Sequence, residues 1–369
     1  MATARMAALA ACVLVMAASA SLAARSLDVA VGKALFERIW TVAGASNQAS
    51  DGLGPLFNAR ACASCHPGGG GGQLPGEGGS GSAGLVLRLP AHSPLGRQLQ
   101  TQAVPGQRVE GELELAWRTE TRRLADGTVV ELRAPAWRVT QDGAGMAHGS
   151  LRLAPDLAGL GWVEAALRGS GLRPFGLKGS HASLKAQVEE ALLLDLGLST
   201  TARPEAWGDC TAAQAECRAA PQGAEQEAEL SDEVVDALAS YVRALPPPPP
   251  LAPPDPQGLA RFDAAGCAAC HQPQAGGLAA YSDFRSHDLG DGLADDDPDD
   301  PDRKRWRTTP LWGLGTRLQN NLPLLHDGRA RDAMEAILWH GGEASMSVAN
   351  VTSMPAADRD RLLDFLKGL

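Results

Sequence analysis

The chain has 369 residues, of which 44% are hydrophobic and 21% charged, values typical of a globular protein and not of a disordered or collagen-like chain. Its formal net charge of −10 argues against nucleic acid and anionic membranes as partners, and suits a basic soluble protein. With 42 Gly and 25 Pro residues, much of the fold is expected to be loop.

Residues 1–24 are predicted to be a secretory signal peptide. Arg5 supplies a positive charge, Met6 to Ala18 is apolar, and small residues from Ala20 to Ala24 offer a cleavage site. The apolar run is too short for a bilayer, so no membrane span is expected. Cys12 stands in a lipoprotein-like box, but few apolar residues precede it. The mature protein is therefore expected in the periplasm.

Four helices and one hairpin are predicted from the periodicity of apolar residues. Helical spacing marks Leu27 to Val42, Leu184 to Leu196, Ser231 to Leu245 and Gln257 to Ala265. Residues Gln107 to Thr140 instead alternate around a turn, which predicts an inserted β-hairpin. These elements favour a mainly α fold class with a small β insertion and many loops.

A proline-rich stretch supplies the predicted domain boundary. Pro246 to Pro250 and Pro253-Pro254 can be accommodated neither by a helix interior nor by a central strand. Such a segment acts as a semi-rigid spacer. We therefore expect an N-terminal domain at 25–245, a linker at 246–256 and a C-terminal domain at 257–369.

A Cys-x-x-Cys-His motif occurs in each predicted domain. The two copies are Cys62, Cys65 and His66, and Cys267, Cys270 and His271. This spacing lets two thiols add to the vinyl groups of one porphyrin while the imidazole bonds the iron. Zinc or a thioredoxin-type redox pair is the alternative, disfavoured by the histidine in both copies and by the lack of a βαβ pattern. Two covalently bound c-type haems are therefore predicted.

The remaining cysteines of the mature chain, Cys210 and Cys217, lie in a polar loop of an exported protein. A local disulfide is the default prediction there, because no histidine is close enough in sequence for a metal site. The acidic segment Asp291 to Asp302 is interpreted as a solvated surface loop, with a calcium site as the alternative.

Five segments carry a resemblance to a known family. They are Asp51–Arg60, Tyr281–Asp283, His287–Gly290, Arg307–Trp312 and His326–Ala330. Together they resemble the dihaem oxidoreductase (thiol-oxidoreductase-like) family, within the bacterial dihaem cytochrome c peroxidase superfamily. The resemblance implies two cytochrome c-like haem lobes and peroxidase-type chemistry. A thiol oxidase activity has no support beyond the family's informal label.

The resemblance also implies a second axial ligand for the C-terminal haem. The superfamily places a methionine or a tyrosine downstream of the His-Asp-Gly turn, and the matching position here is His340. A haem with two histidine ligands, His271 and His340, is therefore expected. Met346 and Met354 are the alternative ligands. Imidazole in place of thioether would lower the reduction potential of this haem.

The first haem departs from the family pattern, because no histidine follows its motif between Pro67 and Pro90. This haem is expected to be five-coordinate or to find its ligand elsewhere. By resemblance, Gln187 matches a distal glutamine, and Glu190 or Asp195 would act as the acid that assists peroxide cleavage. Hydrophilic positions on a helix face are the alternative for both acids.

The resemblance further implies a calcium ion between the haems, held by backbone oxygens of Thr308 and Pro310. The asparagine that completes such a site is not evident in the sequence. Trp306, Trp312 and Trp339 follow the second motif, and each is a candidate for a tunnelling step between the irons or for simple packing.

The expected function is therefore an exported dihaem oxidoreductase. Electrons would come from a soluble donor, such as a small cytochrome or a cupredoxin, enter at the C-terminal haem and pass to the N-terminal haem. Peroxide would be reduced there, or a partner protein oxidised as substrate. The alternative is a non-enzymatic electron-transfer cytochrome in which both irons carry two protein ligands.

Overall fold

The computed structural model describes residues 26–47, 50–75, 84–140, 148–221, 223 and 228–369. The expected signal peptide, together with Cys12, lies outside the described residues. Within the described part, no helix combines the length and the apolar character needed to cross a bilayer.

The helices fall into two groups along the chain. Residues 26–37 are helical and are followed by α2 (Cys62–Cys65), α3 (Leu160–Ala166), α4 (Leu184–Ala191), α5 (Ala215–Arg218) and α6 (Asp232–Ala244). The second group is α7 (Pro256–Ala265), α8 (Leu314–Gln319), α9 (Ala333–Trp339), α10 (Ser345–Ser353) and α11 (Ala356–Gly368). Single turns of helix are η1 (Pro67–Gly69), η3 (Cys267–Ala269), η4 (Asp291–Leu293) and η5 (Gly342–Ala344), and η2 (Leu192–Leu196) is a π-helical continuation of α4.

The strands of the described residues pair into antiparallel two-stranded sheets. The pairs are β1 (Leu56–Phe57) with β3 (Gln102–Ala103), β2 (Leu85–Arg88) with β6 (Ser150–Leu153), β4 (Glu112–Arg123) with β5 (Val129–Thr140), and β7 (Ser286–Asp288) with β8 (Arg305–Arg307). The β4–β5 hairpin confirms the expected insertion.

The expected mainly α fold class is wrong. The chain is 34% helical and 17% strand, with several small sheets rather than two helical lobes. The strands other than β4 and β5 are two to four residues long. Runs this short contain too few residues to show an alternating pattern, so these strands could not be predicted from the sequence.

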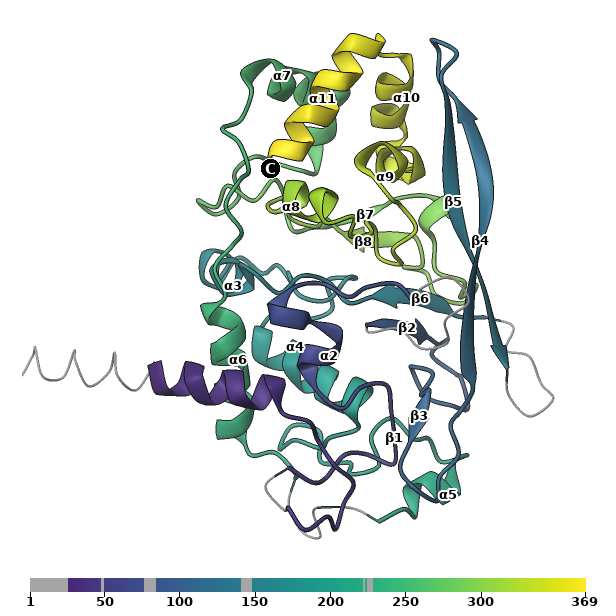
Figure 1. Cartoon of the computed structure of the whole chain (residues 1–369), viewed down its shortest axis with the longest axis vertical. Helices are drawn as coiled ribbons and strands as arrows, with labels where there is room; N and C mark the ends of the chain where they lie inside the picture. The colour runs from purple at the N-terminus through teal and green to yellow at the C-terminus, as the bar shows by residue number, and fades with distance from the viewer. Residues whose placement is uncertain (1–25, 48–49, 76–83, 141–147, 222, 224–227) are drawn as a thin grey trace, which may run out of the picture.

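The four predicted helices are present, with shifted ends. Figure 1 shows α2, α4 and α6 in the lower half of the molecule and α7 to α11 in the upper half. The helix at residues 26–37 packs so closely on α6 that a Cβ at Gly32 would lie 1.9 Å from the Ala237 carbonyl oxygen. The proline-rich segment connects α6 to α7, and the domain division there remains a prediction.

The β4–β5 hairpin extends along both halves (Figure 1). Its buried residues Leu124, Leu132 and Ala134 belong to the same core as the C-terminal helices, although they precede the linker in sequence. Burial of a leucine side chain contributes about 1.5–3 kcal/mol. The hairpin therefore ties the N-terminal part of the chain to the C-terminal core.

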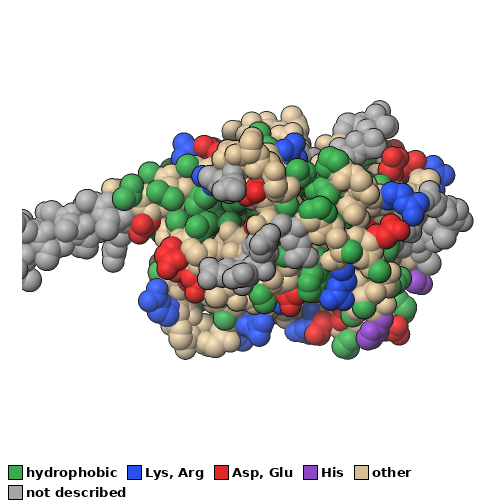
Figure 2. Space-filling model, turned by 90° about the horizontal axis from the view of Figure 1, so that it is seen from below, with side chains coloured by type: hydrophobic (Ala, Val, Ile, Leu, Met, Phe, Trp, Pro, Cys, Tyr) green, Lys and Arg blue, Asp and Glu red, His purple; other side chains and the backbone are tan. Residues whose placement is uncertain are grey.

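The end of the molecule that carries the helix of residues 26–37 is shown in Figure 2. Acidic and basic side chains are mixed across this face, with an apolar area beside that helix. Leu27 and Val31, which belong to this helix, have exposed side chains.

Candidate haem sites

The first motif lies on α2 and continues into the η1 turn. Cys62 and Cys65 are not disulfide-bonded, and burial raises the pKa of each thiol to about 12. His66 has its Nδ1 3.2 Å from the Gly70 carbonyl oxygen. A metal-ligating histidine commonly donates its second ring N–H to a backbone carbonyl in this way, which leaves Nε2 to bond the metal.

A cavity of about 770 Å³ opens beside the first motif and is lined by Cys62, Cys65 and His66. Its walls also include apolar side chains such as Phe175 and Leu184. A cofactor site is expected to be concave and mostly apolar with a few convergent polar groups, and this cavity meets that description. The residues present therefore fit a haem bound through the first motif.

The second motif begins at the end of α7, where Gly266 takes a positive φ of 86°. His271 has its Nδ1 2.9 Å from the Tyr281 carbonyl oxygen. Burial, together with the nearby His340, lowers the pKa of His271 to about 4. The imidazole is therefore neutral at pH 7, as an iron ligand requires.

His340 repeats this arrangement at the end of α9. Its Nδ1 lies 2.7 Å from the Ala336 carbonyl oxygen, and burial lowers its pKa. The structure thus brings His271 and His340 together, and in the described part of the chain neither Nε2 has a hydrogen-bond partner. Met346 is 71% exposed, which makes it a poor alternative ligand, whereas Met354 packs against the C-terminal core. The geometry favours His340.

A charged triad lies beside the second motif. His287 Nε2 is 2.9 Å from Asp283 Oδ2, and its Nδ1 is 2.8 Å from Glu343 Oε2. Burial opposes the charged form, but these two carboxylates outweigh it and raise the pKa of His287. Because both ring nitrogens are engaged, His287 is not available as an iron ligand. The Asp283 amide donates to the Cys270 carbonyl, which fixes the triad next to the haem motif.

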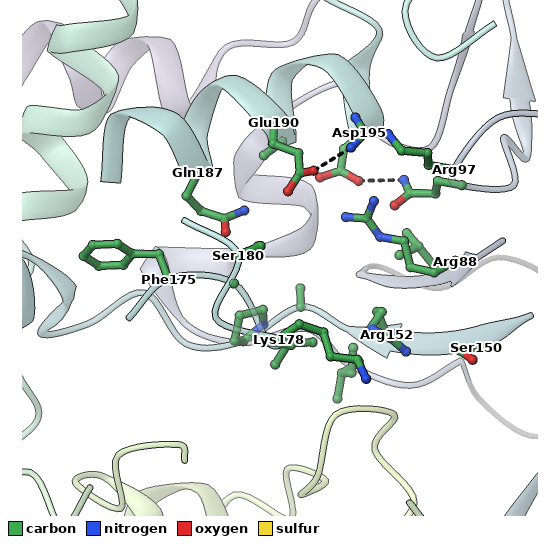
Figure 3. A pocket seen from close by; sticks show the side chains of 18 of the residues that line it. Arg88, Arg97, Ser150, Arg152, Phe175, Lys178, Ser180, Gln187, Glu190 and Asp195 are labelled. Atoms are coloured by element: carbon green, nitrogen blue, oxygen red, sulfur yellow. Dashed lines mark hydrogen bonds and ion pairs between the residues drawn. The ribbon is translucent and has the colours of Figure 1, made fainter. Parts of the chain in front are cut away.

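Three residues expected at the first haem all line its cavity. Gln187, Glu190 and Asp195 come from α4 and η2 (Figure 3). The Oε1 atom of Gln187 has no hydrogen-bond partner in the described part of the chain. A buried acceptor without a donor is costly, so Gln187 is suited to a ligand placed in the cavity.

Glu190 is held by two partners that the sequence did not identify. His181 Nε2 lies 2.7 Å from its Oε2, and Arg97 Nη1 lies 2.9 Å from its Oε1. Burial raises its pKa, but the His181 hydrogen bond and the nearby Arg88 and Arg97 charges lower it overall to about 2. Glu190 is therefore ionised at neutral pH. It is better suited to holding Arg97 and His181 in place than to exchanging protons.

Asp195 has the opposite character. It lines the cavity, accepts a 2.7 Å hydrogen bond from Gln98 Nε2, and burial raises its pKa despite the Arg88 charge. Its charge acts on Cys62 and His66, so it lies near the first motif. A carboxylate whose pKa is raised takes up a proton more readily than an ordinary one, which makes Asp195 the better candidate general base.

We expect Glu190→Gln to destabilise the protein. A pKa lowered from 4.5 to about 2 corresponds to about 3 kcal/mol of stability. That contribution is complete above pH 4.5 and is lost as the pH falls toward 2, because the folded carboxylate binds its proton more weakly than the unfolded one. Chemical denaturation between pH 2.5 and 7 measures the difference from the wild type.

Glu189→Gln is the matched control, since Glu189 is the neighbouring residue on α4 and makes no ion pair in the described part of the chain. It should leave the free energy of unfolding unchanged. Equal losses in the two variants at pH 7 would contradict the assignment.

The calcium site implied by the resemblance does not fit. The Thr308 carbonyl already accepts hydrogen bonds from Ser282 Oγ at 2.7 Å and Arg307 Nη1 at 2.9 Å. Arg307 Nε donates to the Gly176 carbonyl, and although burial lowers its pKa to about 10 it stays charged at neutral pH. A guanidinium beside Thr308 and Pro310 repels a divalent cation. Among the described residues, no cluster of three or more Cys, His, Asp or Glu could hold a metal ion.

Cys210 and Cys217 form a disulfide in the structure, with their Cα atoms 6.3 Å apart. The acidic segment is less solvated than expected, because Asp295 is buried. Its Oδ2 accepts hydrogen bonds or ion pairs from Arg152 at 2.7 Å and Lys178 at 2.9 Å. No short motif in the sequence signals this cluster, since its members come from three distant segments.

A stacked pair of rings lies between the cavity wall and the C-terminal core. Trp306 and His326 are parallel, with centroids 3.7 Å apart and planes inclined by 13°. The Lys178 ammonium lies 4.1 Å, and the Arg152 guanidinium 4.7 Å, from the Trp306 centroid. Lys178 and Arg152 line the cavity, whereas Trp306 belongs to the core that contains Trp339 and contacts Cys267. Trp306 therefore bridges the surroundings of the two motifs.

Comparison with known proteins gives a partial match. Residues 275–369 match the family described as "Di-haem oxidoreductase, putative peroxidase". A solved structure of hydrazine synthase from Kuenenia stuttgartiensis is 18% identical, with a TM-score of 0.33 over 60% of this chain and 73% of that one. No curated protein matches the chain. The family match over residues 275–369 confirms the resemblance found in the sequence and supports, at this coarse level, an oxidoreductase that uses haem.

Proposed function

We propose that the protein is an exported c-type dihaem oxidoreductase that reduces peroxide at the first motif. The observation that carries this proposal is the contrast between the two sites. His340 lies beside His271 at the second motif, whereas the cavity at His66 is lined by Gln187, and the other imidazole among its described walls is that of the exposed His92. An open iron position admits a substrate, and two strong ligands do not.

The haems would supply the electron-transfer and peroxide-cleaving chemistry when bound, through the two Cys-x-x-Cys-His motifs. The chain's own residues would hold and order the reactants. His66 would fix the first haem from one side, and Gln187 would hydrogen-bond a peroxide in the cavity through its side-chain amide. Asp195 would accept and return the peroxide proton, while ionised Glu190 holds Arg97 and His181 in place.

The proposed direction of electron flow runs from the His271–His340 site to the His66 cavity. Trp306 supports this route because it contacts residues of the cavity wall and of the C-terminal core. A small cytochrome or a cupredoxin is the proposed donor, since a chain of net charge −10 attracts a basic soluble partner. The proposal includes the alternative that a partner protein is oxidised as substrate at the first haem. The periplasm is the proposed location, where the Cys210–Cys217 disulfide would be stable.

A spin-state titration separates this proposal from a pure electron carrier. The oxidised protein should show one high-spin ferric haem that shifts on addition of cyanide, and one low-spin haem that does not. After partial reduction, hydrogen peroxide should reoxidise the protein within the mixing time of a stopped-flow instrument. Two low-spin haems that resist both cyanide and peroxide in every redox state would establish the carrier instead.

A further inference from the structure

Arg88 presents its guanidinium to the first cavity. It stands at the end of β2 and lines the cavity beside Arg97 and Arg152. It makes no hydrogen bond or ion pair with a residue in the described part of the chain, whereas Arg97 and Arg152 each make at least one. Figure 3 shows its side chain directed into the space between Asp195 above and Lys178 below.

A guanidinium in this position is expensive to leave unsatisfied. It carries five N–H donors in a fixed planar fork and cannot be neutralised at ordinary pH. Burial lowers the pKa of Arg88, and the charges of Arg97 and Arg152 act in the same direction. A ligand that fills the cavity and displaces water would therefore have to offer this charge an acceptor.

The neighbouring carboxylates are already engaged elsewhere. Glu190 accepts from His181 and Arg97, and Asp195 accepts from Gln98. They attract Arg88 through space but make no hydrogen bond with it. Arg88 therefore directs positively charged N–H donors into the cavity, and no described residue accepts a hydrogen bond from them. This arrangement is expected where a ligand supplies an anion.

The arginine side chains labelled in Figure 3 gather toward one end of the cavity. Phe175 lies at the end opposite the arginines in Figure 3, and Leu184 and Leu177 line the same cavity. A haem has a matching asymmetry, because its two propionate carboxylates leave the ring from one edge and the rest of the macrocycle is apolar. Carboxylates pair with guanidinium groups through two parallel N–H···O bonds.

We propose that Arg88 binds a propionate carboxylate of the haem attached at the first motif, making it a cofactor-binding residue. The assignment rests on the proposed function, since it takes this cavity to be the haem pocket. The same donors would suit a free oxyanion that enters as substrate, and the test distinguishes these two sources of the anion.

Resonance Raman spectroscopy of the holoprotein reads the propionate directly. Its propionate bending band reports the hydrogen bonds made by the carboxylate. We expect this band to shift to lower frequency in Arg88→Gln, with part of the shift recovered in Arg88→Lys. The reduction potential of the first haem should fall in Arg88→Gln, because a positive charge beside the haem favours its ferrous state. Arg122→Gln, at an exposed position on β4, is the control and should change neither quantity.

Haem content is measured first on every sample, so that two kinds of failure stay separate. A wild type with fewer than two haems contradicts the proposed function itself. With two haems present, an unshifted propionate band in Arg88→Gln overturns the assignment. If the band is unshifted while formate binds the ferric protein more weakly, Arg88 serves a free anion instead. If Arg88→Gln yields no holoprotein, the same measurement is made on Arg88→Lys. Lysine keeps the positive charge but cannot make two parallel hydrogen bonds with the carboxylate.

Discussion

His340→Ala is expected to convert the second haem from a low-spin to a high-spin centre. His340 is half-buried, lies close to His271, and directs Nδ1 to the Ala336 carbonyl, so that Nε2 is left for the iron. Without this ligand the iron loses its strong field on one side. Optical and EPR spectra of the oxidised protein should show the low-spin signal replaced by a second high-spin signal, and added imidazole should restore it.

Met346→Ala is the control for this variant, because Met346 is 71% exposed and should leave the spectrum unchanged. A low-spin signal that survives in His340→Ala would contradict the bis-histidine assignment. If that signal disappears in Met354→Ala instead, the methionine is the ligand.

Removing both thiols of one motif is expected to halve the covalently bound haem. The variants are Cys62→Ala with Cys65→Ala, and Cys267→Ala with Cys270→Ala. Each should retain one haem per chain after acid–acetone extraction, because each motif attaches its own porphyrin. The first pair should abolish the cyanide-responsive high-spin signal, and the second should abolish the low-spin signal.

The disulfide provides the matched cysteine control. Cys210→Ala with Cys217→Ala should keep both haems and lose about 2–3 kcal/mol of stability, the value expected from chain entropy for a short loop. Haem loss of equal size in all three double variants would mean that general misfolding, not attachment, sets the haem content.

The elements of regular period could be predicted from the sequence, and the cavity could not. The alternation of residues 107–140 predicted the hairpin because β4 and β5 are each 12 residues long. The fold class was wrong because the other strands are too short to show a period. The position of the hairpin could not be predicted from the sequence either, since Leu124 and Leu132 join a core built from segments more than a hundred residues away.

The candidate sites divide in a similar way. The two haem motifs are local in sequence, so their thiols and histidines were identified directly. His340 came from resemblance, and only the fold places it near His271. Arg88, which comes from a separate strand, has no motif around it, and nothing in its sequence neighbourhood indicates that it faces a cavity.

The role of Glu190 shows why the charges that surround a side chain could not be predicted from the sequence. On a helical wheel it is one more polar residue of α4. The fold surrounds it with Arg97 from a loop and His181 from the segment before α4, and these partners hold its pKa at about 2. Five residues further along, Asp195 is enclosed with a single amide partner and its pKa rises. Two carboxyl groups that line one cavity, Glu190 and Asp195, therefore have pKa values shifted in opposite directions.

The mass of the denatured, exported wild-type chain tests the central claim most directly. Two covalently attached porphyrins should add two haem masses to the polypeptide, and a pyridine haemochrome assay on the same sample should give two c-type haems per chain. A polypeptide that leaves denaturant at its unmodified mass, with its colour lost to the solvent, would contradict the account.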